Sequence, residues 1–151
     1  NAVVFRTLSK AAGLAGIRLG FAMGSPALVR ALGTVKSPYN LNALTQAVGR
    51  QVLARPGFIK SSVRDILASR DELRAGLCAI GSRHPGALSF YDTMTNFVFV
   101  RLPDAGLVYE ALKARGVLVR HIGDCLRITA GSEYENGRLL EALEDSLEEG
   151  A

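Results

Sequence analysis

The alternation of apolar and polar residues divides the chain into a region of short strands, a helical middle and a mixed C-terminal part. Residues 2–5 form a short apolar run, and residues 17–23 are mostly apolar with Arg18 as the charged exception. Both runs are predicted to be buried strands. Helical spacing follows in three stretches. The first begins after Ser25 and is predicted to stop at Gly33, and the second covers residues 43–54. A break is predicted at Arg55-Pro56-Gly57, and a helix of about 24 residues is expected after it.

The last part of the sequence predicts a small unit of strands and helices. Strands are expected at residues 87–90, 96–102, 117–120 and 126–129, the last two joined as a hairpin through Gly123-Asp124. One helix is predicted between Asp104 and Gly116. The last helix is predicted after a capping box at Ser132 and is expected to bury Leu139, Leu140, Leu143 and Leu147. We place the domain boundary inside the long helix near Arg70, which gives domains 1–70 and 71–151.

Composition and charge narrow the classes of function. A hydrophobic content of 48% with 21% charged residues is typical of a folded globular protein. The net charge is +4, but the basic residues are scattered and the last helix is acidic, so we expect no nucleic-acid partner. No apolar run approaches the ~20 residues that span a bilayer, and the first residues do not resemble a secretion signal, so neither a membrane nor export is expected. The two cysteines lack metal-ligand spacing, which favours a reducing cytoplasm and predicts no metal site.

Candidate chemistry is concentrated in the turn between the first two predicted strands. Lys10 lies there with the hydroxyls of Thr7 and Ser9 and the guanidinium of Arg18. Desolvation favours the neutral amine of a lysine, which can form a Schiff base with a carbonyl. Hydroxyl and guanidinium groups donate well to a phosphate. An aldehyde and a phosphate near one lysine indicate pyridoxal phosphate, although the same residues also suit a solvated surface turn.

The sequence of this turn resembles a known lysine motif. Thr-Leu-Ser-Lys-Ala at residues 7–11 and Gly-Leu-Ala-Gly-Ile-Arg-Leu-Gly at residues 13–20 are similar to the lysine motif of fold-type I pyridoxal-phosphate aminotransferases, best to the histidinol-phosphate aminotransferase branch. The similarity continues through residues 95–100, 116–120 and 126–131. The resemblance implies an α/β fold, namely the C-terminal part of the large domain plus a small α+β domain. It also implies that Lys10 forms the internal aldimine and moves a proton, and that Thr7, Ser9 and Arg18 hold the cofactor phosphate.

Three residues of the C-terminal part are candidates for substrate binding. Arg127 alternates with Leu126 and Ile128, so it points to the opposite face of its strand. By resemblance it pairs with the substrate α-carboxylate, and the alternative is a structural ion pair. Arg120 suits a distal phosphate by the same resemblance, or it is a solvated residue at a strand end. Asn96 borders the carboxylate in the family, or it only caps a strand.

The resemblance implies an enzyme of histidine biosynthesis. It would be a homodimer that transfers an amino group between histidinol phosphate, or an aromatic amino acid, and 2-oxoglutarate. A pyridoxal-phosphate decarboxylase of a phosphorylated amino acid and a non-catalytic fragment are the alternatives. The family segments that carry the phosphate loop, the stacking aromatic residue and the aspartate partner of the pyridine nitrogen do not precede Asn1. We therefore expect a C-terminal portion of such an enzyme, inactive alone, with exposed edges on the first strand.

Overall fold

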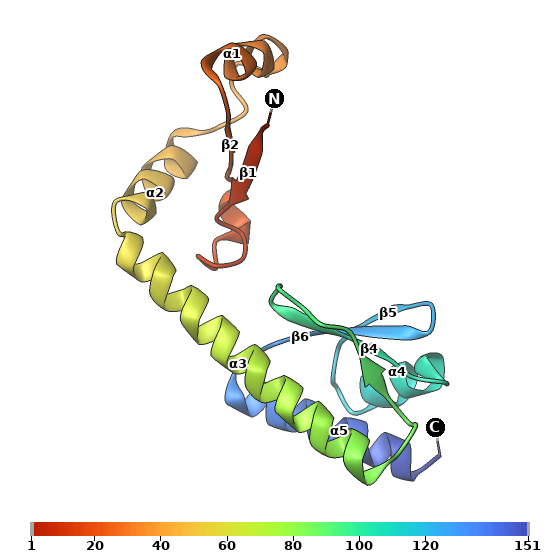
Figure 1. Ribbon diagram of the computed structural model, residues 1–151. Helices are drawn as coiled ribbons and strands as arrows, with labels where there is room; N and C mark the ends of the chain where they lie inside the picture. Colours follow the sequence, from red (N-terminus) through yellow and green to blue (C-terminus); the bar gives the residue numbers. More distant parts are fainter. Residues whose placement is uncertain (1, 151) are drawn as a thin grey trace. The chain divides into compact units, whose positions relative to one another are not determined.

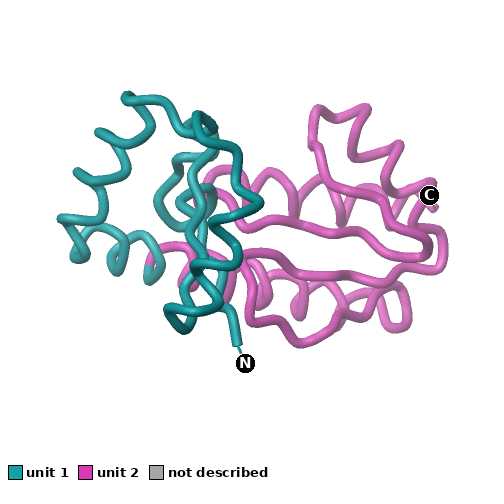
Figure 2. The backbone as a smooth tube through the Cα atoms, turned by 90° about the horizontal axis from the view of Figure 1, so that it is seen from above, with its two compact units in different colours: residues 1–64 teal, residues 65–151 magenta. Residues whose placement is uncertain are grey.

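The computed structural model describes residues 2–150 and contains two compact units, Asn1–Arg64 and Asp65–Ala151 (Figure 2). The boundary between them falls in helix α3 (Pro56–Arg83), which contributes to both units. The predicted boundary near Arg70 lies in the same helix. The assignment of a cofactor domain to residues 1–70 and of a separate small domain to residues 71–151 stays a prediction. Each unit is described by itself below.

The first unit contains a two-stranded antiparallel sheet (Figure 1). Strand β1 (Val4–Thr7) pairs with β2 (Gly20–Met23), and the 3-10 helix η1 (Ala15–Ile17) lies in the connection between them. The two predicted strands form, at residues 4–7 and 20–23 instead of 2–5 and 17–23, but the prediction that they are buried is wrong. Every residue of β1 is exposed, and β2 has only one partly buried position. A pair of strands needs further strands or a helix on its face to bury side chains, and no third strand joins this sheet in residues 2–150.

Three helices follow β2, and the first two begin with a side-chain cap. The Ser25 hydroxyl accepts from the backbone N–H of Leu28 at the start of α1 (Pro26–Val35), and the Asn42 side chain accepts from that of Thr45 at the start of α2 (Ala43–Leu53). The predicted stop at Gly33 is wrong, because α1 continues to Val35 and Gly33 does not take the positive φ of a helix-ending glycine.

The predicted break at Arg55-Pro56-Gly57 is correct for Arg55 and wrong for Pro56 and Gly57, which belong to α3. Pro56 is the first residue of α3, where a proline lacks no hydrogen bond that the helix would have made. The break is therefore confined to Ala54 and Arg55, and α3 reaches 28 residues instead of about 24. None of the helices in residues 2–150 is both long and apolar enough to cross a membrane.

The second unit contains a four-stranded antiparallel sheet in the order β3-β4-β6-β5. The strands are β3 (Ser89–Phe90), β4 (Phe97–Arg101), β5 (Arg120–Ile122) and β6 (Cys125–Thr129), with α4 (Ala105–Ala114) and α5 (Glu133–Glu148) between and after them. The predicted hairpin through Gly123 is confirmed, with Ile122 opposite Cys125 and Gly123 at φ 59°. The capping box at Ser132 and Glu135 is confirmed as well.

One strand of this unit starts later than predicted. Residues 117–119 are not in a strand, because the Val117 N–H donates to the Leu112 carbonyl at 2.9 Å while the Gly116 N–H donates to the Lys113 carbonyl at 3.0 Å. These two bonds, with Gly116 at φ 77°, form a Schellman motif that ends α4. The backbone of Val117 therefore belongs to the helix end, and β5 begins only at Arg120.

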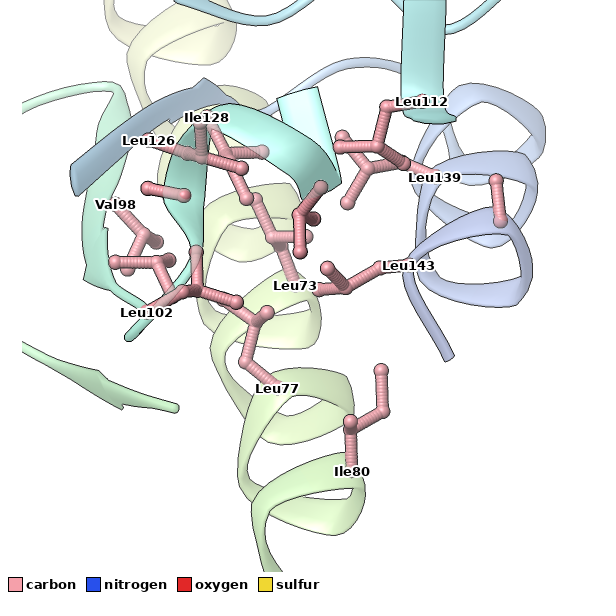
Figure 3. Packing of buried hydrophobic residues seen from close by; sticks show 14 residues of the cluster. Leu73, Leu77, Ile80, Val98, Leu102, Leu112, Leu126, Ile128, Leu139 and Leu143 are labelled. Atoms are coloured by element: carbon pink, nitrogen blue, oxygen red, sulfur yellow. The ribbon is translucent and has the colours of Figure 1, made fainter. Parts of the chain in front are cut away.

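The core of the second unit lies between one face of the sheet and its helices (Figure 3). Alternate residues of β4 and β6 point into it, and α3, α4 and α5 supply the rest. Its labelled members include Leu73, Leu77, Ile80, Val98, Leu112, Leu126, Ile128, Leu139 and Leu143. Leu140 and Leu147, which were predicted to be buried, are only partly buried against this cluster. The remaining residues of the strands, Arg127 among them, point to the other face of the sheet.

Candidate active site

The turn that carries Lys10 is anchored on both sides by buried apolar residues. Leu8 and Ala12 belong to the small core of the first unit, together with Leu19. The Lys10 carbonyl accepts from the Gly13 N–H at 2.9 Å, and Gly13 has φ 66°, which closes a tight turn. Lys10 is therefore held between two anchors with its side chain exposed. The expected desolvation of Lys10 does not come from the described residues of this unit, because the strands beside it are themselves exposed.

The hydroxyls of Thr7 and Ser9 lie beside each other at the start of this turn. Their oxygens are 2.8 Å apart, and the Ser9 N–H donates to Thr7 Oγ1 at 3.1 Å. Thr7 Oγ1 also donates to the Leu19 carbonyl at 3.2 Å, which ties the start of the turn to the residue after Arg18. Because the Thr7 proton is directed at Leu19, the Ser9 hydroxyl is the donor in the Thr7–Ser9 pair. An anion bound here would accept a hydrogen bond from the Ser9 hydroxyl once the Ser9 proton turns away from Thr7.

Arg18 has an unusual backbone conformation. It is the one residue other than glycine with positive φ in residues 2–150, at φ 53° and ψ 43°. Residues with a side chain rarely adopt this left-handed region, and such strain is often found at functional positions. The Arg18 guanidinium donates to the Ala15 carbonyl at 3.0 Å, and within residues 2–150 no hydrogen bond or ion pair joins it to Thr7, Ser9 or Lys10. The hydroxyls, the amine and the guanidinium are nonetheless a donor set whose chemistry fits a phosphate ester with an aldehyde.

Arg127 and Arg120 lie directly opposite each other in the second unit. The register of β5 and β6 pairs these two residues, and the register of β4 and β6 pairs Arg127 with Phe99. Residues paired in this way point to the same face of a sheet, so both arginines lie on the face away from the core. Like charges at opposed positions destabilise a sheet unless an anion lies between them. This pair is therefore a candidate site for an anionic group.

Arg127 has no acidic partner in the described part of the chain. Its guanidinium lies over the ring of Phe97, with Cζ 5.2 Å from the ring centroid, and its buried Nε has no hydrogen-bond partner. The alternative role in a structural ion pair is thus wrong within residues 2–150. Both arginines line a pocket of about 250 Å³ together with Val119 and Thr129. A larger pocket of about 660 Å³ at the start of α5 contains none of the predicted site residues.

Asn96 lies immediately before β4, at the end of the sheet where β6 finishes. Its carbonyl accepts from the Ala130 N–H at 3.0 Å, which extends the pairing of the two strands by one bond. No hydrogen bond of its side-chain amide is recorded within residues 2–150, so the role in strand capping belongs to its backbone. Phe97, the residue after it, contacts Arg127. Asn96 lies opposite Ala130, three positions along the chain from Arg127.

Sequence reasoning missed a residue that holds the loop before Asn96. Arg70, on α3, donates from Nη1 to the carbonyls of Thr93 and Thr95 at 3.4 and 3.3 Å, and it pairs with Asp71. Charged residues on a long helix are usually solvated, so the sequence pattern carried no signal for this contact.

A second group that the sequence did not indicate contains His84, Glu144 and Glu148. Their potential ligand atoms lie within 4.8 Å of one another. The carboxylate of Glu144 is already paired with both Arg83 and His84. Arg83 is the main cause of the lowered pKa of Glu144, and a cation at this place would have to displace it.

Comparison with known proteins finds a family whose model matches this chain. Residues 1–143 match the model of the family described as aminotransferase class I and II. The chain is 41% identical over 153 residues to histidinol-phosphate aminotransferase of Thermoanaerobacter pseudethanolicus, which covers 97% of this chain and 42% of that protein. The chain thus spans less than half the length of the curated relatives that it matches.

Two solved structures share the fold. Histidinol-phosphate aminotransferase of Sinorhizobium meliloti in complex with pyridoxal-5'-phosphate matches with a TM-score of 0.82 and 24% identity, over 99% of this chain and 42% of that one. L-threonine-O-3-phosphate decarboxylase of Porphyromonas gingivalis matches with a TM-score of 0.81 and 20% identity, over 97% of this chain and 46% of that one. At these identities the two structures establish the fold. The family model, which covers nearly the whole chain and includes the Lys10 turn, establishes more: this chain belongs to the class I and II aminotransferases.

Proposed function

We propose that this chain is the C-terminal portion of a pyridoxal-phosphate-dependent aminotransferase that exchanges an amino group between histidinol phosphate and 2-oxoglutarate. The opposed pair of Arg120 and Arg127 is the observation that carries the choice of substrate, because it offers two cations on one sheet face with no acidic partner in residues 2–150. The identity of 41% to a histidinol-phosphate aminotransferase supports the same substrate.

The residues proposed to bind the cofactor lie in the turn of the first unit that carries Lys10. Lys10 is the amine that holds the cofactor aldehyde, and when free it is the base that moves a proton at the substrate Cα. Thr7, Ser9 and Arg18 donate to the cofactor phosphate. The cofactor, when bound, supplies the electron sink of the reaction. The anchoring of the Lys10 turn by Leu8 and Ala12 supports this role, because it fixes the backbone while leaving the amine accessible.

The residues proposed to bind the substrates lie in the second unit, on the outer face of β5 and β6. Arg127 binds a carboxylate of glutamate or 2-oxoglutarate in a bidentate manner, and the stacking of its guanidinium on Phe97 sets the plane of that fork. Arg120, directly opposite, binds the phosphate of the amino donor or the second carboxylate of the acceptor. Asn96 orients the same carboxylate. One pair of arginines thus accommodates both substrates, since each of them is an anion.

The test is an amino-transfer assay on the full-length protein that contains this chain, with histidinol phosphate and 2-oxoglutarate as substrates and glutamate as the detected product. Arg127→Lys keeps the charge but loses the bidentate fork, so kcat/KM should fall about 10- to 100-fold. Lys10→Ala should abolish turnover. Arg115→Lys and Lys113→Ala are the matched controls and should retain activity, because these two cations already pair with Glu149 and Glu110.

Other products would assign a different activity. Release of carbon dioxide from a phosphorylated amino acid would identify a decarboxylase, and preference for aromatic amino acids would identify the neighbouring aminotransferase branch. Loss of activity in the control variants and retention in Arg127→Lys would contradict the proposed substrate site. A homodimer and a cytoplasmic location follow from the same proposal and stay predictions, as does the inactivity of the 151-residue chain alone.

A further inference from the structure

The left-handed backbone of Arg18 is held from both sides by one face of α2. Thr45 and Gly49 are four residues apart, so they lie on the same face of this helix. Both are buried, and Thr45 is one of only three buried polar residues in residues 2–150. These two residues contact the chain immediately before and immediately after Arg18.

Thr45 fixes the residue before Arg18. Its hydroxyl donates to the Ile17 carbonyl at 3.0 Å, a bond between residues 28 positions apart. The carbonyl of Ile17 belongs to the peptide plane that it shares with the Arg18 nitrogen, so this bond restricts the rotation that sets φ of Arg18. Thr45 is itself fixed, because its backbone N–H donates to the capping side chain of Asn42 at 2.8 Å.

Gly49 fixes the residue after Arg18. A Cβ atom at position 49 would overlap the Cδ2 methyl of Leu19, so only glycine lets Leu19 pack this closely against α2. Leu19 is buried in the core of the first unit, and its carbonyl accepts from both the Leu8 N–H and the Thr7 hydroxyl. The packing of Leu19 against Gly49 therefore also sets the position of Thr7 relative to Arg18.

We propose that Thr45 is a positioning residue that, together with Gly49, holds Arg18 in the left-handed conformation from which it binds the cofactor phosphate, an inference that rests on the function proposed above. Without the Thr45 bond, a residue with a side chain relaxes towards negative φ, and this rotation changes the direction in which the Arg18 side chain leaves the backbone. Thr45 touches no cofactor atom in this account and acts only through the backbone at Ile17 and Arg18.

The test separates phosphate binding from general loss of structure by using two probes. The full-length protein is titrated with pyridoxal 5'-phosphate and with pyridoxal, which lacks the phosphate. Thr45→Val keeps the shape of the side chain and removes the hydroxyl. It should therefore lower the affinity for pyridoxal 5'-phosphate about five- to tenfold and change the affinity for pyridoxal by less than twofold. Thr45→Ser restores the hydroxyl and should restore the affinity for pyridoxal 5'-phosphate.

A matched control and a double variant complete the design. Thr34, on the exposed helix α1, also donates its hydroxyl to a backbone carbonyl, that of Ala31 at 2.7 Å, so Thr34→Val removes the same kind of bond elsewhere and should leave both affinities unchanged. In an Arg18→Ala background, Thr45→Val should not lower the affinity for pyridoxal 5'-phosphate any further, because both residues act on the same contact with the cofactor phosphate.

The outcomes distinguish a failure of the positioning role from a failure of the proposed cofactor site. If Thr45→Val lowers the affinities for both probes equally, or lowers neither, the positioning role is overturned. If that variant does not fold, Gly49→Ala takes its place, since it displaces Leu19 and should produce the same phosphate-selective loss. A wild-type protein that binds pyridoxal as tightly as pyridoxal 5'-phosphate would instead overturn the proposed cofactor site itself.

Discussion

Asn136 offers a sharp test of how the second unit is held together. It is 6% exposed at the start of α5, and its amide joins three groups. The oxygen accepts from the Gly131 N–H at 2.9 Å, and the nitrogen donates to the Ser69 carbonyl at 3.2 Å and the Ser69 hydroxyl at 2.9 Å. The Ser69 hydroxyl in turn donates to the Gly131 carbonyl at 2.6 Å. The network thus ties α3 to the turn that follows β6.

Replacing Asn136 with alanine would remove all three contacts at once. The Ser69 hydroxyl keeps its bond to Gly131, and the Ser69 carbonyl, inside α3, keeps its helical bond, so the Gly131 N–H is the group that loses its partner. An orphaned backbone group of this kind costs about 1–3 kcal/mol. The lost bonds to Ser69 add to this cost, and the better helix propensity of alanine offsets about 0.5 kcal/mol. We therefore expect Asn136→Ala to lower the free energy of unfolding of this unit by about 1–3 kcal/mol.

The assay is urea denaturation followed by circular dichroism, combined with amide hydrogen exchange at residues 129–132. Exchange at Gly131 should accelerate in Asn136→Ala, because its N–H has lost its acceptor. The neighbouring Gly137→Ala is the control: a Cβ there meets no atom within 4 Å, so this variant should be neutral or slightly stabilising. A loss below about 1 kcal/mol, or unchanged exchange at Gly131, would refute the network argument.

Three further predictions follow from the second unit. Leu77→Ala removes a side chain that is 0% exposed in the core and should lower the free energy of unfolding by about 2–5 kcal/mol in the same urea assay. The hydrogen bonds from Arg83 hold the pKa of Glu144 below its ordinary value of 4.5, so this carboxylate stabilises the fold above about pH 4.5 and loses its effect as the pH falls through the lowered pKa. The difference in Tm between wild type and Glu144→Gln should therefore be larger at pH 7 than at pH 3. Burial raises the pKa of the Cys125 thiol, whereas Cys78 is exposed, so a thiol reagent at pH 8 should modify Cys78 first and Cys125 only after unfolding.

The sequence was most informative where local chemistry determines the structure. The caps at Ser25, Asn42 and Ser132 each follow from a short polar side chain that meets free backbone N–H groups at a helix start. The hairpin at Gly123 and the strand at Phe97–Arg101 follow equally from turn chemistry and from β-branched and aromatic content. The alternation around Arg127 correctly placed its side chain on the face opposite Leu126 and Ile128.

The sequence failed where contacts between distant residues decide the outcome. Apolar runs predicted buried strands for β1 and β2, but burial depends on neighbouring strands that the runs themselves do not reveal. The same limit applies to the candidate site. The motif supplied Thr7, Ser9, Lys10 and Arg18, yet it gave no indication that Thr45 bonds Ile17 from 28 positions away.

The central claim is that Lys10 holds the cofactor, and covalent trapping tests it most directly. The full-length protein is incubated with pyridoxal 5'-phosphate, reduced with sodium borohydride and digested for peptide mass spectrometry. We predict a phosphopyridoxyl group on the peptide that contains Lys10, and none in Lys10→Ala. Labelling of a different lysine instead of Lys10, or the same yield of labelled protein in Lys10→Ala, would contradict the account.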